Sequence, residues 1–290
     1  TPASGLEKVM PDIDSQTQNT GDGDVLLTRP RTRRNFLRGA GAGAALALVP
    51  GLFASCNDGG EPTIPGGGTG TPGPTPVTGV SFDLRTDVGI FRLVDALEQL
   101  EGAFYTTVVA SANFTSFFNA DEREVLTDIR DAEVIHREFV RAALGAQRLP
   151  DLRGSINMTT LNTILSSKAN ILASARLFEH LGVSGLNGAG KYLQDPRNLL
   201  LAGKLVSVEA RHVAALRDIA PPSGNANTAF AGDDVINGMG LDVKLEAGAV
   251  LDRVIATNLL VAGTFATPPI SNGPTANQGV ATADFFPATP

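Results

Sequence analysis

The sequence predicts an all-α protein built on a four-helix bundle, and two motifs carry this prediction. Glu133–His136 and Glu209–His212 both have the pattern Glu-x-x-His, each inside a stretch whose apolar residues recur with helical spacing. A separation of three residues places the two side chains on one face of a helix. Two further stretches of this kind carry lone glutamates. One glutamate from each of two helices, with Glu-x-x-His from each of the other two, is the ligand set of a dinuclear metal site in a four-helix bundle.

These four helices supply seven candidate metal ligands, and a carboxylate on a core stripe is costly unless it is paired or binds a metal. Carboxylate and imidazole groups suit iron, manganese or zinc rather than the soft copper sites. We therefore expect two iron or manganese ions, with iron favoured and zinc as the alternative. The opposing interpretation is that the motifs are ordinary surface pairs. The candidates are Glu98, Glu101, Glu133, His136, Glu179, Glu209 and His212.

The composition bounds the remaining possibilities. The chain has 290 residues, 42% of them hydrophobic, which is enough for one domain of good size with tails. Its formal net charge of −7 argues against a nucleic-acid partner. A single cysteine excludes an internal disulfide framework, and the absence of Cys-x-x-Cys-His excludes covalent c-type haem.

Residues 1–55 have the features of an export signal. The segment 32–38 resembles a twin-arginine motif through Arg33 and Arg34, and an apolar run follows it. Small residues then precede Cys56 in the manner of a lipobox, which predicts a lipid-anchored protein of the bacterial cell envelope, periplasmic or at the surface. The alternative is an ordinary signal peptide with an incidental cysteine. Residues 56–81 are rich in Gly, Pro and Thr and predict a tether between the anchor and the domain.

The first bundle helix is expected from about Thr86 to Ser111. Glu98, Glu101 and Tyr105 share one stripe of this helix, so either glutamate can be the ligand. Tyr105 is a candidate for a hydrogen bond to a ligand or for electron transfer, and the alternative is a core tyrosine with a satisfied hydroxyl.

The second helix is expected to begin near Asn119, because Glu122 three residues later completes a capping-box pattern. Its buried stripe is predicted to contain Glu133, His136 and Phe139, and Gly145 is expected to end the helix.

The third helix is expected from near Thr159 and carries Glu179. His180 would point about 100° away from Glu179 and is therefore not expected to be a ligand. The glycines in 185–191 are interpreted as a flexible break before the fourth helix. Asp195 followed by Pro predicts the start of that fourth helix.

The bundle is thus expected over residues 82–220, followed by a C-terminal extension over 221–290. Within the extension, residues 244–261 are a candidate fifth helix that packs on the bundle. The end of the chain is rich in Pro, Asn and Thr, with an apolar anchor at Phe285–Phe286.

Four segments carry a family resemblance. Residues 97–105, 131–136, 178–183 and 208–212 resemble the exported ferritin-like domain proteins related to plant desiccation-associated proteins. The resemblance implies a ferritin-like bundle in which Glu133 and Glu209 bridge two metals and each histidine binds one of them. Glu179 and either Glu98 or Glu101 would be terminal ligands. In the wider superfamily, this ligand set supports ferroxidases, rubrerythrin-type peroxidases and manganese catalases.

The sequence therefore predicts a cell-envelope oxidoreductase that oxidises Fe²⁺ or reduces O₂ or peroxide. The alternative is a non-catalytic binding or scaffold lipoprotein with structural metal or none. The expected partners are metal ions, O₂ or H₂O₂, and a membrane reached through the lipid anchor only. A homodimer is expected by analogy with similar bundles, whereas the anchor and tether disfavour a closed cage.

Overall fold

A computed structural model describes residues 75–222, 229, 232 and 234–275 of the chain. The expected export motif with Arg33 and Arg34, the lipidation residue Cys56, most of the tether and Phe285–Phe286 lie outside these described residues. Within them, none of the helices combines the length and hydrophobicity that a membrane crossing needs.

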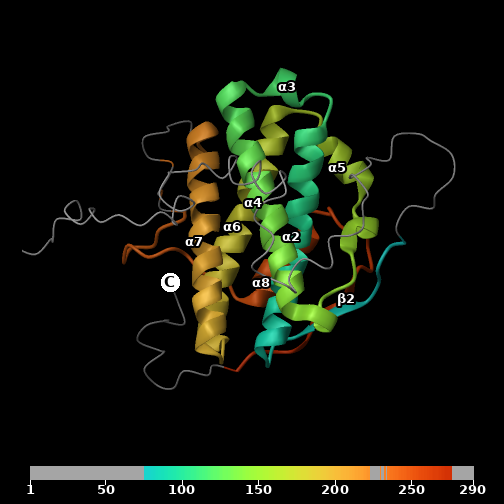
Figure 1. The fold of residues 1–290 in the computed structure, drawn as a ribbon, viewed down its shortest axis with the longest axis vertical. Coiled ribbons are helices and arrows are strands. Elements are labelled where there is room, and N and C mark those ends of the chain that lie inside the picture. Colours follow the sequence, from blue (N-terminus) through green and yellow to red (C-terminus); the bar gives the residue numbers. More distant parts are fainter. Residues whose placement is uncertain (1–74, 223–228, 230–231, 233, 276–290) are drawn as a thin grey trace, which may run out of the picture. The chain divides into compact units, whose positions relative to one another are not determined.

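Four long helices form the bundle in the described part of the chain, and Figure 1 shows them side by side. α2 packs mainly against α4 and α6 mainly against α7, while α2–α6 and α4–α7 contacts close the bundle. The all-α bundle predicted from the motifs is confirmed. The four helices are α2 Asp87–Ala110, α4 Ala120–Leu144, α6 Lys168–Ala189 and α7 Pro196–Ile219. Shorter helical segments are α3 Phe114–Phe117, η1 Gly145–Gln147, η2 Leu152–Ser155 and η3 Gly190–Tyr192.

Local capping determines where three of these helices begin. The side chain of Thr86 accepts a hydrogen bond from the Gly89 amide at the start of α2. Asn119 and Glu122 form the predicted capping box of α4, and Asp195 caps α7 just before its first-turn proline. At its C-terminal end α4 stops at Gly145, whose φ of 55° is readily adopted only by glycine.

The predicted third helix is wrong at both ends. It begins as a separate helix, α5 Met158–Ile164, which is capped by Asn157, and α6 then starts behind its own cap, Ser167. Two cap residues in close succession allow the chain to turn between the two helices. The expected break at residues 185–191 is also wrong, because α6 continues to Ala189.

The glycines of that segment serve close packing instead of flexibility. A Cβ atom at Gly188 would lie 1.9 Å from the carbonyl oxygen of Leu245, and one at Gly185 would lie 3.3 Å from Val250. The amide of Leu245 also donates a hydrogen bond to the carbonyl of Ser184. The chain 57 residues further on therefore lies directly against α6.

This contact places helix α8, Ala247–Ala256, on the bundle. Its buried residues Val250, Leu251 and Val254 join the main hydrophobic core. The expected fifth helix is thus present and docked, but it is shorter than the predicted 244–261. The stretch 244–261 is consequently part of the packed domain.

Two short strands were not predicted. β1 Val80–Asp83 and β2 Phe265–Asn272 pair in parallel with an irregular register. Val80 and Phe82 are buried, and Phe82 meets Phe265 edge to face with ring centroids 5.7 Å apart. The tether expected over 56–81 therefore ends before Val80, because that residue already belongs to the core.

One position on α4 corrects the predicted buried stripe. Phe139 is 48% exposed, and Ile135 one turn before it is 52% exposed. The buried arc of α4 is narrow and passes through Ala132, Glu133, His136 and Val140, so Phe139 lies outside it.

Candidate metal centre

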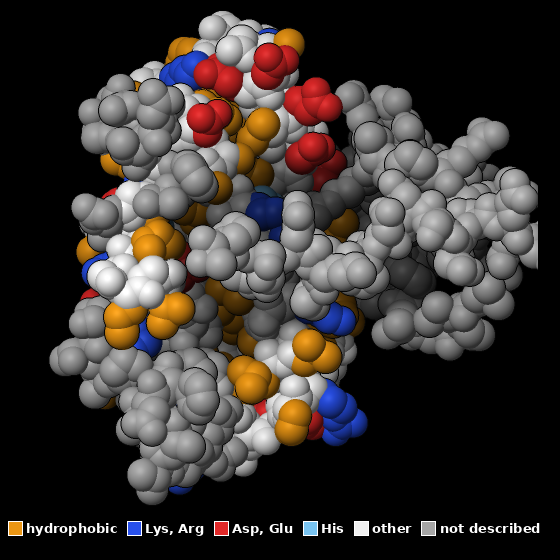
Figure 2. Space-filling model, turned by 90° about the vertical axis from the view of Figure 1, so that its left-hand side faces the viewer, with side chains coloured by type: hydrophobic (Ala, Val, Ile, Leu, Met, Phe, Trp, Pro, Cys, Tyr) orange, Lys and Arg blue, Asp and Glu red, His pale blue; other side chains and the backbone are white. Residues whose placement is uncertain are grey.

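Six of the predicted ligands come together in the middle of the bundle from four different helices. α2 supplies Glu98, α6 supplies Glu179, and α4 and α7 each supply a Glu-x-x-His pair. All six side chains are buried. In the face of the molecule drawn in Figure 2, acidic side chains gather at the upper end and only a small area of histidine is visible. The six buried candidate ligands fall into two groups in which one ligand atom per residue lies within 4.8 Å of the others. The first group is Glu98, Glu133, His136 and Glu209, and the second is Glu133, Glu179, Glu209 and His212.

The first group is centred on His136. Its Nδ1 atom lies 3.0 Å from Oε1 of Glu209, 3.4 Å from Oε2 of Glu133 and 3.7 Å from Oε2 of Glu98. Three carboxylates from three helices therefore face one imidazole nitrogen.

The second group repeats this arrangement around His212. Its Nδ1 atom lies 2.9 Å from Oε1 of Glu133, 3.1 Å from Oε2 of Glu179 and 3.9 Å from Oε2 of Glu209. Glu133 and Glu209 thus each direct one oxygen to His136 and the other to His212. The two rings stack at 27° with their centroids 6.3 Å apart. This is the placement that two carboxylates shared between neighbouring cations require.

The hydrogen bonding of the site tests whether the residues fit metal ions. Six buried carboxylate oxygens have no hydrogen-bond partner among the described residues: Oε2 of Glu98, Oε1 of Glu179 and both oxygens of Glu133 and of Glu209. Native proteins rarely leave buried polar atoms unpaired, and unpaired buried carboxylates are especially costly. Oxygen and imidazole donors around two adjacent positions fit two divalent ions of the iron, manganese or zinc type.

The pKa values of the site residues indicate how their charges compensate one another without metal. Burial, together with the charges of Glu133 and Glu209, raises the pKa of Glu98 and of Glu179 well above the ordinary value. Burial also acts to raise the pKa of Glu133, but the close ion-pair contacts with the imidazole groups of His136 and His212 lower it to about 2.

The two histidines show the reciprocal effect. Burial acts to lower their pKa values, but the neighbouring carboxylates outweigh it and raise the pKa of His136 to about 9 and that of His212 to about 10. The metal-free site therefore holds two imidazolium protons at neutral pH, and two divalent ions would take over their compensating role.

Glu101 and Tyr105 occupy different places from Glu98. Glu101 is buried and its pKa is raised by burial and by Glu209 and Glu133, but it lies in neither ligand group. The geometry therefore favours Glu98 as the ligand from α2. Tyr105 is fully buried near Glu179, and burial and the Glu179 carboxylate raise its pKa. Its hydroxyl has no hydrogen-bond partner of ordinary geometry among the described residues.

His180 lies outside both groups, in keeping with its offset from Glu179. Its Nε2 atom is 3.2 Å from Nη1 of Arg217. Burial and the charge of Arg217 lower the pKa of His180.

The comparison with known families covers all six residues of the two ligand groups. Residues 86–221 match the family model described as the ferritin-like domain. This segment therefore has a ferritin-like fold. No curated protein and no solved structure matches the chain.

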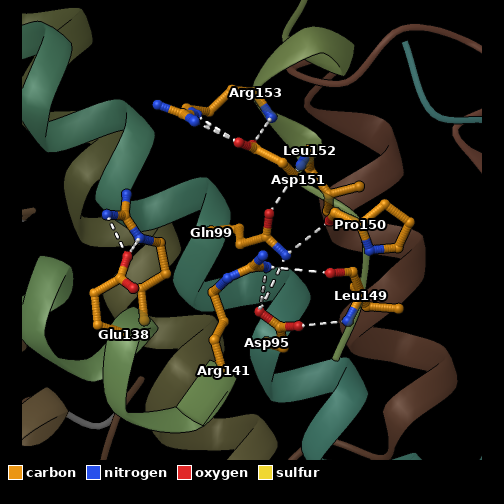
Figure 3. A network of polar contacts seen from close by, with 10 residues as sticks. Asp95, Gln99, Glu138, Arg141, Leu149, Pro150, Asp151, Leu152 and Arg153 are labelled. Atoms are coloured by element: carbon orange, nitrogen blue, oxygen red, sulfur yellow. Dashed lines mark hydrogen bonds and ion pairs between the residues drawn. The ribbon is translucent and has the colours of Figure 1, made fainter. Parts of the chain in front are cut away.

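The matched segment also contains buried and half-buried polar residues that the sequence interpretation did not single out. Asp95 and Gln99 lie on α2 on either side of Glu98, and Arg141 lies on α4. Figure 3 shows these side chains joined to the loop at Leu149–Leu152. One feature of the sequence could have indicated Arg141: an arginine follows the histidine by five residues in each Glu-x-x-His motif.

Proposed function

We propose that this protein is a dinuclear metal-carboxylate oxidoreductase that oxidises Fe²⁺ or reduces O₂ or peroxide. The observation that carries the proposal is the division of the oxygens of Glu133 and Glu209 between His136 and His212. Two adjacent ions can share a two-electron reduction, and a fixed separation between them favours it.

In this proposal each residue of the site has a defined role. Glu133 and Glu209 would hold both ions, Glu98 and His136 would complete one position, and Glu179 and His212 would complete the other. Two iron or manganese ions, when bound, supply the electrons that O₂ or peroxide accepts. The histidines bind as neutral imidazoles, so they lose their protons as the metal enters.

The surroundings of the second position support redox chemistry there. Phe104 packs edge to face against both Tyr105 and Phe178, with ring centroids 5.0 and 5.1 Å apart. This apolar wall keeps water away from the Tyr105 side of the site. The unpartnered Tyr105 hydroxyl next to Glu179 is therefore our candidate catalytic group, which would donate a hydrogen bond or a proton during the reaction.

The place of action is proposed from the sequence. Arg33 and Arg34 support export by the twin-arginine pathway, and Cys56 supports lipid anchoring at the cell envelope. The membrane would then be a partner through the anchor only, and a homodimer remains our proposal for the assembly.

A second candidate function is a binding or scaffold protein with structural metal or none. The ion pairs between the histidines and Glu133 favour this second function, because protonated His136 and His212 compensate the charge of the buried Glu133 without any metal ion. The bundle could then be stable as an empty domain.

Metal content per chain distinguishes the two candidates. The full chain is reconstituted with Fe²⁺ or Mn²⁺ without oxygen, beside the double variant Glu133→Ala/Glu209→Ala. Glu124→Ala/Glu138→Ala serves as the control, because both glutamates are exposed on α4. We expect two ions in the parent and the control and none in the site variant, followed by O₂ and peroxide consumption assays. Equal metal content in all three proteins would contradict the proposal.

A further inference from the structure

The two metal-binding helices share a longer pattern than Glu-x-x-His. In α4, Glu133 and His136 are followed by Arg141, and in α7, Glu209 and His212 are followed by Arg217 at the same spacing. The Arg141 side chain is 15% exposed and that of Arg217 only 3%. A guanidinium that is largely removed from water requires partners on several sides, so the contacts of each arginine are informative.

Arg141 connects α4 to α2 and to the loop that follows α4. Its Nη1 atom lies 3.4 Å from Oδ1 of the fully buried Asp95 and donates to the carbonyl of Leu149. Asp95 accepts hydrogen bonds from the Leu149 amide at 2.8 Å and from the Gln99 side chain at 3.0 Å. Gln99 in turn accepts from the Leu152 amide at 2.8 Å (Figure 3). Glu98 lies directly beside Gln99 and one turn after Asp95.

Arg217 makes an equivalent set of contacts in the other half of the bundle. It forms a two-pronged ion pair with Asp234 at 2.7 and 2.9 Å, and its Nε atom donates to the carbonyl of Ala229. Its Nη1 atom also contacts Nε2 of His180 on α6. His180 is the residue directly after Glu179. Both arginines therefore connect the loop after their own helix to a polar residue on the helix that carries a terminal glutamate.

We propose that Arg141 and Arg217 are positioning residues, each of which fixes the terminal glutamate of one metal position. Arg141 would fix Glu98 through Asp95 and Gln99, and Arg217 would fix Glu179 through His180. The inference rests on the proposed metal centre.

The physical reason is that Glu98 and Glu179 are held less firmly than the shared glutamates. Each contacts a single histidine, whereas Glu133 and Glu209 each contact two. A small rotation or shift of α2 or α6 would move these carboxylates away from the ion, and metal sites require their ligands within roughly 0.5 Å of the productive position. Groups that orient ligands from outside the coordination sphere change metal affinity by about 10- to 100-fold.

The test uses Co²⁺ as the probe, with the full chain, metal content and the visible spectrum of bound Co²⁺ as readouts. Arg141→Gln and Arg217→Gln are each prepared in the parent, in Glu98→Ala and in Glu179→Ala. We expect Arg141→Gln to weaken one of two Co²⁺ equivalents at least about tenfold and to leave the other unchanged. Arg141→Gln should have no additional effect in Glu98→Ala, where the positioned ligand is already missing, and should weaken the remaining equivalent in Glu179→Ala by the same factor. Arg217→Gln should show the reverse pattern.

A general loss of stability would give a different result, since a purely structural arginine would weaken both equivalents equally in every background. That outcome, or two unchanged equivalents in both arginine variants, would overturn the inference and leave the proposed function intact. Absence of bound Co²⁺ in the parent would overturn both.

Milder variants cover the case in which the arginine variants do not fold. Gln99→Met leaves Asp95 its contacts with Arg141 and the Leu149 amide, and Asp234→Asn leaves Arg217 an amide oxygen and the Ala229 carbonyl as acceptors. Both variants weaken the same connections, and the same pattern is expected from them. Asp87→Asn is the matched control, because Asp87 also connects α2 to a neighbouring segment, by accepting from the amides of Gln194 and Asp195, but lies three turns from Glu98. It should leave both Co²⁺ equivalents unchanged.

Discussion

Oε1 of Glu133 on α4 lies 2.9 Å from Nδ1 of His212 on α7. The reciprocal contact joins Oε1 of Glu209 on α7 to Nδ1 of His136 on α4 at 3.0 Å. Each motif therefore makes its shortest contact with the partner motif rather than within itself. The pair of helices α4 and α7 shares both halves of the site, which explains why one ion would bind to residues of both motifs.

The choice between Glu98 and Glu101 gives the first prediction. Glu98→Ala should lower the metal content of the reconstituted protein from two ions per chain to one, because it removes an oxygen of the first ligand group. Glu101→Ala should keep two ions, since Glu101 lies in neither group. Metal analysis of both variants after gel filtration measures this, and the opposite ranking would assign the ligand role to Glu101.

The pH dependence of the metal-free protein follows from the raised pKa values. His136 titrates at about 9 and His212 at about 10 in the folded state, against about 6.5 when unfolded. Their stabilising contribution is complete below about pH 6.5 and is lost as the pH rises through 9 to 10. The raised pKa values of Glu98 and Glu179 act in the same direction, because ionising these acids destabilises the folded state.

We therefore expect the Tm of the metal-free protein to fall between pH 6 and pH 10. Glu133 does not oppose this trend, since its pKa of about 2 means that its contribution is lost only in strong acid. Thermal unfolding in the presence of a chelator measures the trend. The double variant His136→Gln/His212→Gln should show a shallower dependence, and a Tm that rises over this range in the parent would contradict the assignment.

The close contact at Gly188 predicts a large effect of a small substitution. Gly188→Ala places a methyl group 1.9 Å from a backbone oxygen of Leu245, so the segment leading to α8 must move. We expect a loss of stability of about 1–3 kcal/mol. Gly203→Ala on α7 is the matched control, because no atom lies within 4 Å of its added Cβ. That substitution should instead stabilise the helix by about 0.5–1 kcal/mol in urea unfolding.

Helix α8 offers a second matched pair. Leu251 is 1% exposed and joins the main core, whereas Ile255 on the same helix is 47% exposed. Leu251→Ala should destabilise the whole domain in a single cooperative transition, by about 2–5 kcal/mol. Ile255→Ala should change the stability by about 0.5 kcal/mol or less. A separate early transition in Leu251→Ala would show that α8 unfolds independently of the bundle.

The two tyrosines of the chain allow a clean test of Tyr105. Tyr105→Phe removes only the hydroxyl near Glu179, so metal content should stay at two ions while Fe²⁺ oxidation slows on the order of tenfold or more. Tyr192→Phe is the control, because its hydroxyl donates to Glu246 on the surface. Equal rates in all three proteins, measured by stopped-flow absorbance, would remove Tyr105 from the reaction.

The sequence by itself determined the features that depend on local physics. The caps at Thr86, Asn119 and Asp195 act within one helical turn, so the starts of α2, α4 and α7 could be predicted closely. The spacing of the Glu-x-x-His motifs also acts within one turn. It predicted which faces of α4 and α7 would point inward and that both would carry ligands.

Only the tertiary structure decided the features that depend on distant contacts. Gly188 resembles a helix breaker in the sequence, but its function is set by Leu245, which lies 57 residues away. In the sequence, Val80 resembles the end of the tether, but in the structure it pairs with Phe265 of β2. Glu98 and Glu101 share a helical stripe, and only the packing of α2 against α4 within the bundle brings one of them to the shared carboxylates. In each case the deciding atom lies on another element, and helical periodicity carries no information about where that element packs.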